Sequence, residues 1–292
     1  MSQQILEVSG HQIAAILHNP EVDSLPVAFI HGITSSNQFW SVGQFDWMQD
    51  RKWVALGLPG HFPSKFPDDF VSTDLTGELV GQLLWEALDQ LIGEQPVIIG
   101  GHSTGGFAAV VMASQRPNQV KGLFSLSGFV SGKWIGPLGL LQRFSRAGLL
   151  GRFLFRANFR LLATSEKLFL FGIRFYAENV KGLYDCPTLR PTIKLSYPDY
   201  QKLSRNAMLS WFSRMPDIDM HACLDQITAP SLVLHGREDP IVPFSQGKLI
   251  ADKIPNAKSY FLDHCGHVPM CEQKAKYEEA LGGWLQSVLF KN

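Results

Sequence analysis

Ser103 stands among glycines in the stretch "GGHSTGG" of residues 100–106. Gly101 and Gly105 each lie two residues from this serine, which gives the pattern Gly-x-Ser-x-Gly. Side chains at the two glycines would collide if a strand ending at the serine folded sharply back onto a helix. Such a turn holds a serine hydroxyl above the edge of a sheet, where it can attack a substrate. The spacing therefore predicts that Ser103 is a nucleophile.

A serine hydroxyl needs a general base, and that base needs a third group to orient it. Asp239 lies three residues after Gly236 in "HGREDPIVP", and His267 follows Gly266 in "CGHVPMCE". The order serine, aspartate, histidine is the order used by folds that carry this kind of turn. We therefore expect Asp239 to orient His267 and His267 to take the proton of the serine.

Neighbouring residues offer alternatives for both roles. Glu238 adjoins the predicted acid, and His264 lies three residues before the predicted base. Either could substitute in a relaxed site, although the pattern favours the residues named above. We expect three other histidines to be structural, with His31 bracing a loop, His102 packing beside the nucleophile and His61 within a loop.

The stretch "FIHGIT" of residues 29–34 ends another expected strand. Gly32 lets the backbone turn tightly there, which leaves the amide of Ile33 free to point at the site. The amide of Thr104 lies at the start of the helix that follows the nucleophile, where backbone N–H groups attract negative charge. We expect the amides of Ile33 and Thr104 to form an oxyanion hole for a tetrahedral intermediate.

Short apolar segments and helical patterns alternate along most of the chain, as they must to position these residues. Strands are expected in residues 5–18 (a hairpin turning at Ser9-Gly10), 26–32, 53–64 (a strand that breaks into a Gly/Pro loop), 97–99, 120–128, 231–236 and 258–267. Helices are expected in residues 74–91, 104–114, 245–253 and 272–289. This alternation predicts an α/β fold with a mostly parallel, doubly wound sheet and helices on both faces.

The alternation stops after the sixth expected strand. Residues 130–225 have helical patterns and no clear strand. We therefore expect a core formed by residues 1–129 and 226–292, with residues 130–225 inserted as a helical cap, or lid, over the sheet.

The chain resembles the α/β-hydrolase superfamily over about residues 5–128 and 228–290. The matching stretches are "HGIT" (31–34), "GLPGHFPS" (57–64), "GHSTGG" (101–106), "HGREDPIVP" (235–243) and "CGHVPMCE" (265–272). The resemblance implies that Ser103 is the nucleophile, Asp239 the acid and His267 the base. It also implies a cap after the sixth strand. Members that are dehalogenases or epoxide hydrolases use an aspartate at the nucleophile position, so the serine here indicates acyl transfer.

The leading hypothesis is a serine hydrolase that cleaves a carboxylic ester, thioester or lactone of an apolar small molecule through an acyl-enzyme, without cofactor or metal. One alternative is a cofactor-free lyase or an acyltransferase with the same triad. Another is a ligand-binding receptor that keeps the pocket.

Net charge, apolar runs and cysteine spacing limit which partners and which cellular location are expected. The 292 residues carry a formal net charge of zero, which does not favour nucleic-acid binding. The N-terminus lacks a basic start followed by an apolar core, and no apolar run approaches the roughly 20 residues that span a bilayer. The four cysteines form no C-x-x-C pair and are expected to be reduced, in a cytoplasmic protein. Cys265 and Cys271 are expected to be small buried side chains.

Arg152, Arg156 and Arg160 recur every four residues and so share one face of an expected cap helix. Phenylalanines and leucines cover most of the remaining surface of that helix. It could rest on an anionic membrane, or it could roof an apolar pocket with its arginines facing solvent. The roof is the favoured interpretation, and either one implies an apolar substrate.

Overall fold

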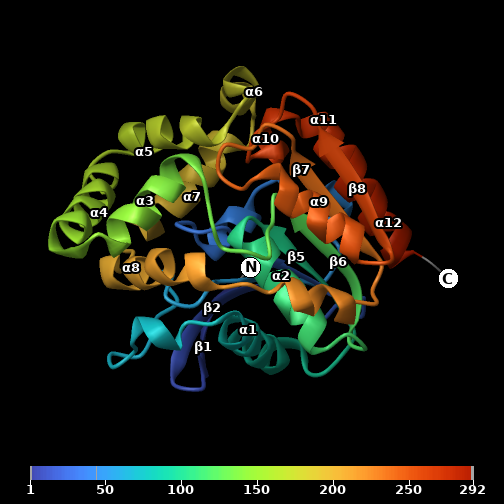
Figure 1. Cartoon of the computed structure of the whole chain (residues 1–292). Coiled ribbons are helices and arrows are strands. Elements are labelled where there is room, and N and C mark those ends of the chain that lie inside the picture. The colour runs from blue at the N-terminus through green and yellow to red at the C-terminus, as the bar shows by residue number, and fades with distance from the viewer. Residues whose placement is uncertain (1, 44, 291–292) are drawn as a thin grey trace.

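A single sheet of eight strands runs through the molecule, as a computed structural model of residues 2–43 and 45–290 shows (Figure 1). The strands are β1 (Ser2–Val8), β2 (His11–His18), β3 (Val27–Ile30), β4 (Trp53–Leu56), β5 (Val97–His102), β6 (Val120–Leu126), β7 (Ser231–Gly236) and β8 (Ala257–Leu262). Their order in the sheet is β1-β2-β4-β3-β5-β6-β7-β8. The strands from β3 to β8 pair in parallel, and the β1–β2 hairpin pairs antiparallel with the edge at β4. The mostly parallel sheet is thereby confirmed.

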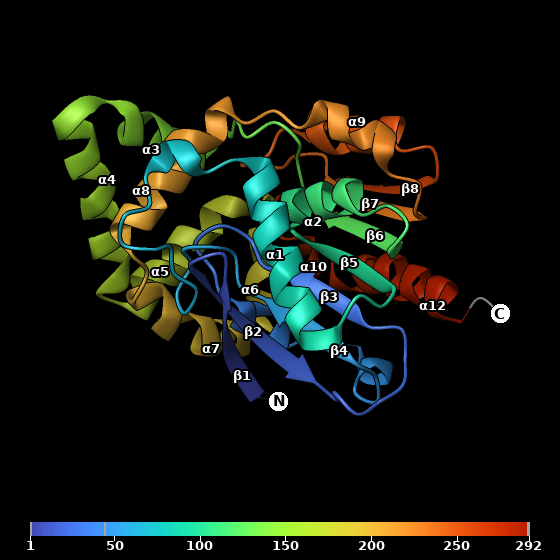
Figure 2. The ribbon, with the colours of Figure 1, turned by 90° about the horizontal axis from the view of Figure 1, so that it is seen from below.

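Helices cover both faces of this sheet (Figure 2). One face packs against α1 (Gly77–Ile92), α2 (Thr104–Gln115) and α9 (Phe244–Lys253). The other packs against α11 (Lys274–Tyr277), α12 (Gly283–Leu289) and two short 3-10 helices, Asn37–Ser41 and Asp46–Met48. In β5, Val97 and Ile99 belong to the first core and Ile98 to the second, because successive side chains of a strand point to opposite faces. The continuous apolar run before the nucleophile therefore reflects burial on both sides.

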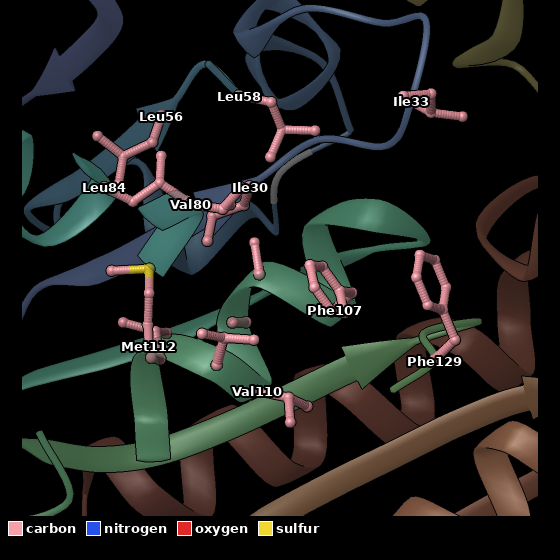
Figure 3. Packing of buried hydrophobic residues seen from close by; sticks show 14 of the residues in the cluster. Ile30, Ile33, Leu56, Leu58, Val80, Leu84, Phe107, Val110, Met112 and Phe129 are labelled. Carbon is pink, nitrogen blue, oxygen red and sulfur yellow. The ribbon is translucent and has the colours of Figure 1, made fainter. Parts of the chain in front are cut away.

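The first core fixes the helix that follows Ser103 (Figure 3). Phe107 of α2 stacks on Phe129 with their ring centroids 5.2 Å apart. Val80 of α1 and Ile30 of β3 belong to the same buried cluster. The start of α2 is thus held by close packing rather than by its own helix propensity.

A helical cap follows the sixth strand, as expected (Figure 1). It consists of α3 (Gly136–Arg146), α4 (Gly148–Ala163), α5 (Glu166–Ile173), α6 (Val180–Asp185), α7 (Leu189–Gln201) and α8 (Arg205–Arg214). All six lie between β6 and β7. The domain boundaries at residues 130 and 225 stay a prediction.

The C-terminal region differs from two expectations, namely a strand over residues 258–267 and a helix over residues 272–289. The last strand already ends at Leu262, and the helical region begins with α10 (Pro269–Glu272). Proline suits a first helical turn because its missing N–H would have no partner there. Gln273, with φ −140°, separates α10 from α11, and a π-helical turn covers Glu278–Gly282. Apolar periodicity did not reveal these breaks, because apolar residues on both sides of them stay buried, among them Tyr277 and Leu281.

Two smaller expectations concern thiols and membrane spans. Cys186, Cys223, Cys265 and Cys271 all have free thiols, and Cys265 and Cys271 are buried as expected; Cys186 and Cys223 are buried too. Among residues 2–43 and 45–290, no helix is both long and apolar enough to cross a bilayer.

Candidate active site

Ser103 lies at the turn between β5 and α2, with φ 56° and ψ −119°. This positive φ is strained for a residue with a side chain. A Cβ atom on Gly101 would approach the carbonyl oxygen of Ile30 to 2.3 Å, and one on Gly105 would approach it to 2.1 Å. Both positions therefore require glycine because β3 passes close to them. The contact between β5 and α2 is a second reason.

Asp239 and His267 form a buried hydrogen-bonded pair. His267 Nδ1 donates to Asp239 Oδ2 over 2.7 Å, which leaves Nε2 as the nitrogen that can accept a proton. Asp239 Oδ1 accepts from the amides of Ile241 and Val242 at 2.8 and 2.9 Å. Burial acts to raise the pKa of Asp239, but His267 and His235 outweigh it and hold that pKa below its usual range. The aspartate is therefore ionised and fixes the orientation of the imidazole.

His235, at the end of β7, is a third member of this cluster that the sequence reasoning missed. Its Nε2 lies 3.3 Å from Asp239 Oδ2 and 3.2 Å from the carbonyl oxygen of Val242. The only signal was a histidine directly before the glycine in "SLVLHG". The carboxylate of Asp239 therefore has two imidazole partners instead of one.

The two alternative residues lie elsewhere. Glu238 and His264 are both exposed, whereas Asp239 and His267 are buried. Glu238 Oε2 accepts from the amide of Cys265 at 3.2 Å, which is a structural contact within the loop. Neither alternative is among the residues that line the cavity beside Ser103 and His267.

Ser103 and His267 line one cavity of about 140 Å³ between the carboxyl edge of the sheet and the cap. Its walls are mostly apolar. The core contributes Ile33, Phe39 and Trp40, and the cap contributes Phe169, Ile173 and Ile193. A cavity of this size can accept a group about as large as benzene.

His31 braces the loop after β3, as the sequence suggested. Its Nε2 accepts from the amide of Leu58 at 3.0 Å, so its Nδ1 carries the hydrogen and donates to the carbonyl of Gly32 at 2.8 Å. Burial lowers the pKa of His31 to about 4, which keeps the ring neutral for this role. Ile33 lines the cavity beside Ser103, and Thr104 is the first residue of α2. The use of their amides as an oxyanion hole stays a prediction.

His102 and His61 both pack as expected. His102 Nε2 lies 2.7 Å from the carbonyl oxygen of His267, and the two ring centroids are 4.8 Å apart. Burial lowers the pKa of His102 to about 3, so its neutral ring donates to that carbonyl. His61 lies between the rings of His31 and Trp211, with centroids 5.4 Å from each. His102 thus also supports the loop that carries the predicted base.

Glu272 is a buried carboxylate that ties the His267 loop to the cap. It accepts from the amides of Gly266 and Val268, on either side of His267, at 2.8 and 3.0 Å. It also accepts from the amides of residues 178 and 179, in the cap, at 2.9 Å each. Sequence reasoning missed this residue, because a glutamate early in a helix is usually an exposed helix-dipole partner.

Tyr176 joins the same region from the cap. Its carbonyl oxygen accepts from the amide of His267 at 2.8 Å, and its ring lies edge-on to the imidazole at 6.1 Å. Burial raises the pKa of Tyr176 to about 12, while a hydrogen bond with Thr34 opposes that rise. We call residues 176–179 the strap. The strap holds the predicted base through both Tyr176 and Glu272.

Replacing Glu272 with glutamine should weaken both the fold and turnover. The amide NH₂ would face at least one backbone N–H, so the free energy of unfolding should fall by about 2 to 3 kcal/mol. The loosened His267 loop should lower kcat on the order of tenfold or more. Urea denaturation and ester hydrolysis measure the two effects. Glu279→Gln, an exposed change of the same charge, is the control, and a Glu272→Gln protein matching it in both assays contradicts the positioning role.

Known proteins share this architecture. The sequence model described as alpha/beta hydrolase fold matches residues 26–273. The 2-hydroxymuconate semialdehyde hydrolase of Pseudomonas sp. (strain CF600) is 24% identical over 198 residues, which are 68% of this chain and 64% of that protein.

Solved structures resemble the whole chain. A thermophilic esterase from Thermogutta terrifontis has a TM-score of 0.72 and 19% identity over 99% of this chain and 100% of its own. The enol-lactonase from Burkholderia xenovorans LB400 has a TM-score of 0.75 and 15% identity over 97% of this chain and 99% of its own. At these identities the likeness shows the fold alone.

Proposed function

The chain belongs to the α/β hydrolase fold family, and from this premise we propose that it is a serine hydrolase that cleaves a carboxylic ester of an apolar small molecule. One observation carries the proposal. His267, which is hydrogen-bonded to Asp239, lines the same apolar cavity as Ser103 on its strained turn. That combination supplies a nucleophile, a base and an orienting acid at one substrate-sized space.

The proposed reaction begins with attack of Ser103 Oγ on the acyl carbon. His267 Nε2 takes the hydroxyl proton, and Asp239 stabilises the resulting imidazolium. The amides of Ile33 and Thr104 stabilise the oxyanion of the tetrahedral intermediate. His267 then gives its proton to the leaving alcohol, and the acyl group stays on the serine.

Water completes the cycle by the same steps. His267 takes a proton from a water molecule, whose oxygen attacks the acyl carbon of the acyl-enzyme. The second tetrahedral intermediate collapses, the acid leaves and Ser103 Oγ regains its proton. Thioesters and lactones present the same kind of acyl carbon, so they are further substrates to compare.

A fluorophosphonate probe and a panel of p-nitrophenyl esters test this proposal. We expect the probe to label the protein, and we expect kcat/KM to rise with acyl length up to the depth of the cavity. Each fully buried CH₂ contributes about 0.8 kcal/mol, or about fourfold. Absence of both labelling and ester turnover would sink the hydrolase proposal. A preference for acetyl over every longer acyl chain would contradict the apolar substrate alone.

A further inference from the structure

The outer face of α4 is apolar and exposed. The exposed fractions are 88% for Leu149, 72% for Leu150, 65% for Phe153 and 55% for Leu161. We call these four residues the α4 face. In two perpendicular views α4 lies at the outer edge of the cap (Figure 1, Figure 2). Large apolar side chains gathered in this way on a surface indicate an interaction site.

The α4 face takes no part in enclosing the substrate. Phe155 and Phe159 form the inner side of the helix and pack on Phe212 of α8, with centroids 5.2 and 5.9 Å away. Of the residues that the structure describes, none from α4 lines the cavity beside Ser103. The roof interpretation of α4 is therefore wrong, and α3, α5 and α7 supply the cap side of the cavity.

The surroundings of the α4 face are basic. Residues 95–165 contain no aspartate or glutamate. Arg143 of α3 and Arg152 and Arg160 of α4 are exposed. Arg146 pairs with Asp217 at 2.9 Å, so its charge is locally neutralised. The other arginines give the surroundings of the α4 face a net positive charge.

A basic groove borders the same face. It lies between α4 and the start of α8, and Phe153 forms part of its wall. Among the described residues, its lining includes the cationic Arg156, Arg160, Lys202 and Arg205 and no acidic residue. Such a groove suits the phosphate of a lipid headgroup, which arginine can bind with two hydrogen bonds.

We propose that α4 docks this protein on an anionic membrane surface. The leucines and Phe153 enter the boundary between headgroups and acyl chains, and the arginines beside them bind lipid phosphates. The helix lies in the plane of the membrane, so docking requires no span. This inference goes beyond the proposed hydrolase function and does not depend on it.

Charge favours a membrane over a second copy of the chain. A two-fold contact through the α4 face would set the arginines of one copy against those of the other, because each copy presents the same patch. Like charges brought together in this way oppose association. Protruding leucines also need no complementary pocket in a bilayer, whereas a protein partner must supply one.

Vesicle flotation of the full chain tests the proposal. The vesicles contain either phosphatidylcholine alone or phosphatidylcholine with one third phosphatidylglycerol. One variant combines Leu149→Ser, Leu150→Ser and Phe153→Ser, and another combines Arg152→Gln, Arg156→Gln and Arg160→Gln. The matched control for charge combines Lys121→Gln, Lys253→Gln and Lys258→Gln, which are exposed elsewhere.

The wild type should bind the anionic vesicles at low salt and far less at high salt, since salt screens the arginines. Loss of the three arginines should lower affinity on the order of 100-fold. Loss of the three apolar side chains should lower it about tenfold or more. The lysine variant should bind like the wild type, and all four proteins should give the same circular dichroism spectrum, which shows that they are folded.

Three results would overturn the proposal. The first is a wild type that does not float with anionic vesicles at low salt. The second is binding that both the apolar and the arginine variants retain. The third is a wild-type dimer in sedimentation that the apolar variant converts to a monomer, which would assign the α4 face to a second copy.

Discussion

Ser103→Ala is expected to abolish labelling by a fluorophosphonate and to lower kcat on the order of 10³-fold or more. The hydroxyl is the only group at this position that could form the acyl-enzyme, and the base and the acid act only through it. The change is small, and alanine faces the same strained φ as serine, so the fold should persist. Intact-mass analysis of the labelled protein and steady-state hydrolysis of the best ester measure the two effects.

A second serine provides the control for this variant. Ser114 is also buried and lies in α2, where its hydroxyl donates to the carbonyl of Val111 at 2.8 Å. Ser114→Ala should be labelled and should turn over ester like the wild type. If Ser103→Ala is still labelled and keeps its turnover, the nucleophile is another residue.

His267→Ala should cost about as much activity as the serine change, because the hydroxyl then has no base. Asp239→Asn should cost less, since the acid orients the imidazole and stabilises its charged form without taking the proton. Both variants are compared with the wild type by kcat for the best ester. Circular dichroism checks that the buried changes leave the fold intact.

The neighbouring residues serve as matched controls for the acid and the base. His264→Ala and Glu238→Gln change exposed residues of the same types, and both should stay within about tenfold of the wild type. A larger loss in His264→Ala than in His267→Ala would move the base to residue 264. A larger loss in Glu238→Gln than in Asp239→Asn would likewise move the acid to residue 238.

Local chemistry made much of this arrangement predictable from sequence. The glycines around Ser103 are needed wherever a strand turns sharply into a helix beside another strand, so their spacing carries the geometry with it. The segment that ends in Gly32 and the loops that carry Asp239 and His267 follow short apolar strands. In a parallel sheet such segments meet at one edge. These signals depend on a few adjacent residues, which a sequence displays directly.

Contacts between distant segments were not predictable in this way. Glu272 binds amides of the strap about 90 residues earlier, and nothing near it in the sequence indicates that these amides lack other partners. His235 reaches Asp239 only because the loop after β7 curls back over the strand end. Tyr176 lies in the cap, where no motif marks its place. Each role depends on how the cap sits on the sheet.

The α4 helix shows a different limit of sequence reasoning. Its pattern contains more phenylalanine and leucine than one buried side can hold, so periodicity alone could not say which of them face inward. The structure buries Phe155 and Phe159 and exposes Leu149, Leu150 and Phe153. Tertiary packing decides between these sets, because only one side of α4 meets α8.

The strap has a consequence for how the cap can move. Caps over active-site cavities can swing aside to admit substrate, and such openings turn about a few fixed residues. Residues 176–179 are hydrogen-bonded to the His267 loop and to Glu272, so lifting the cap at the strap would displace the predicted base from Ser103. A swing that lifts the α4 end instead, with the strap as its pivot, would admit substrate while the base keeps its place.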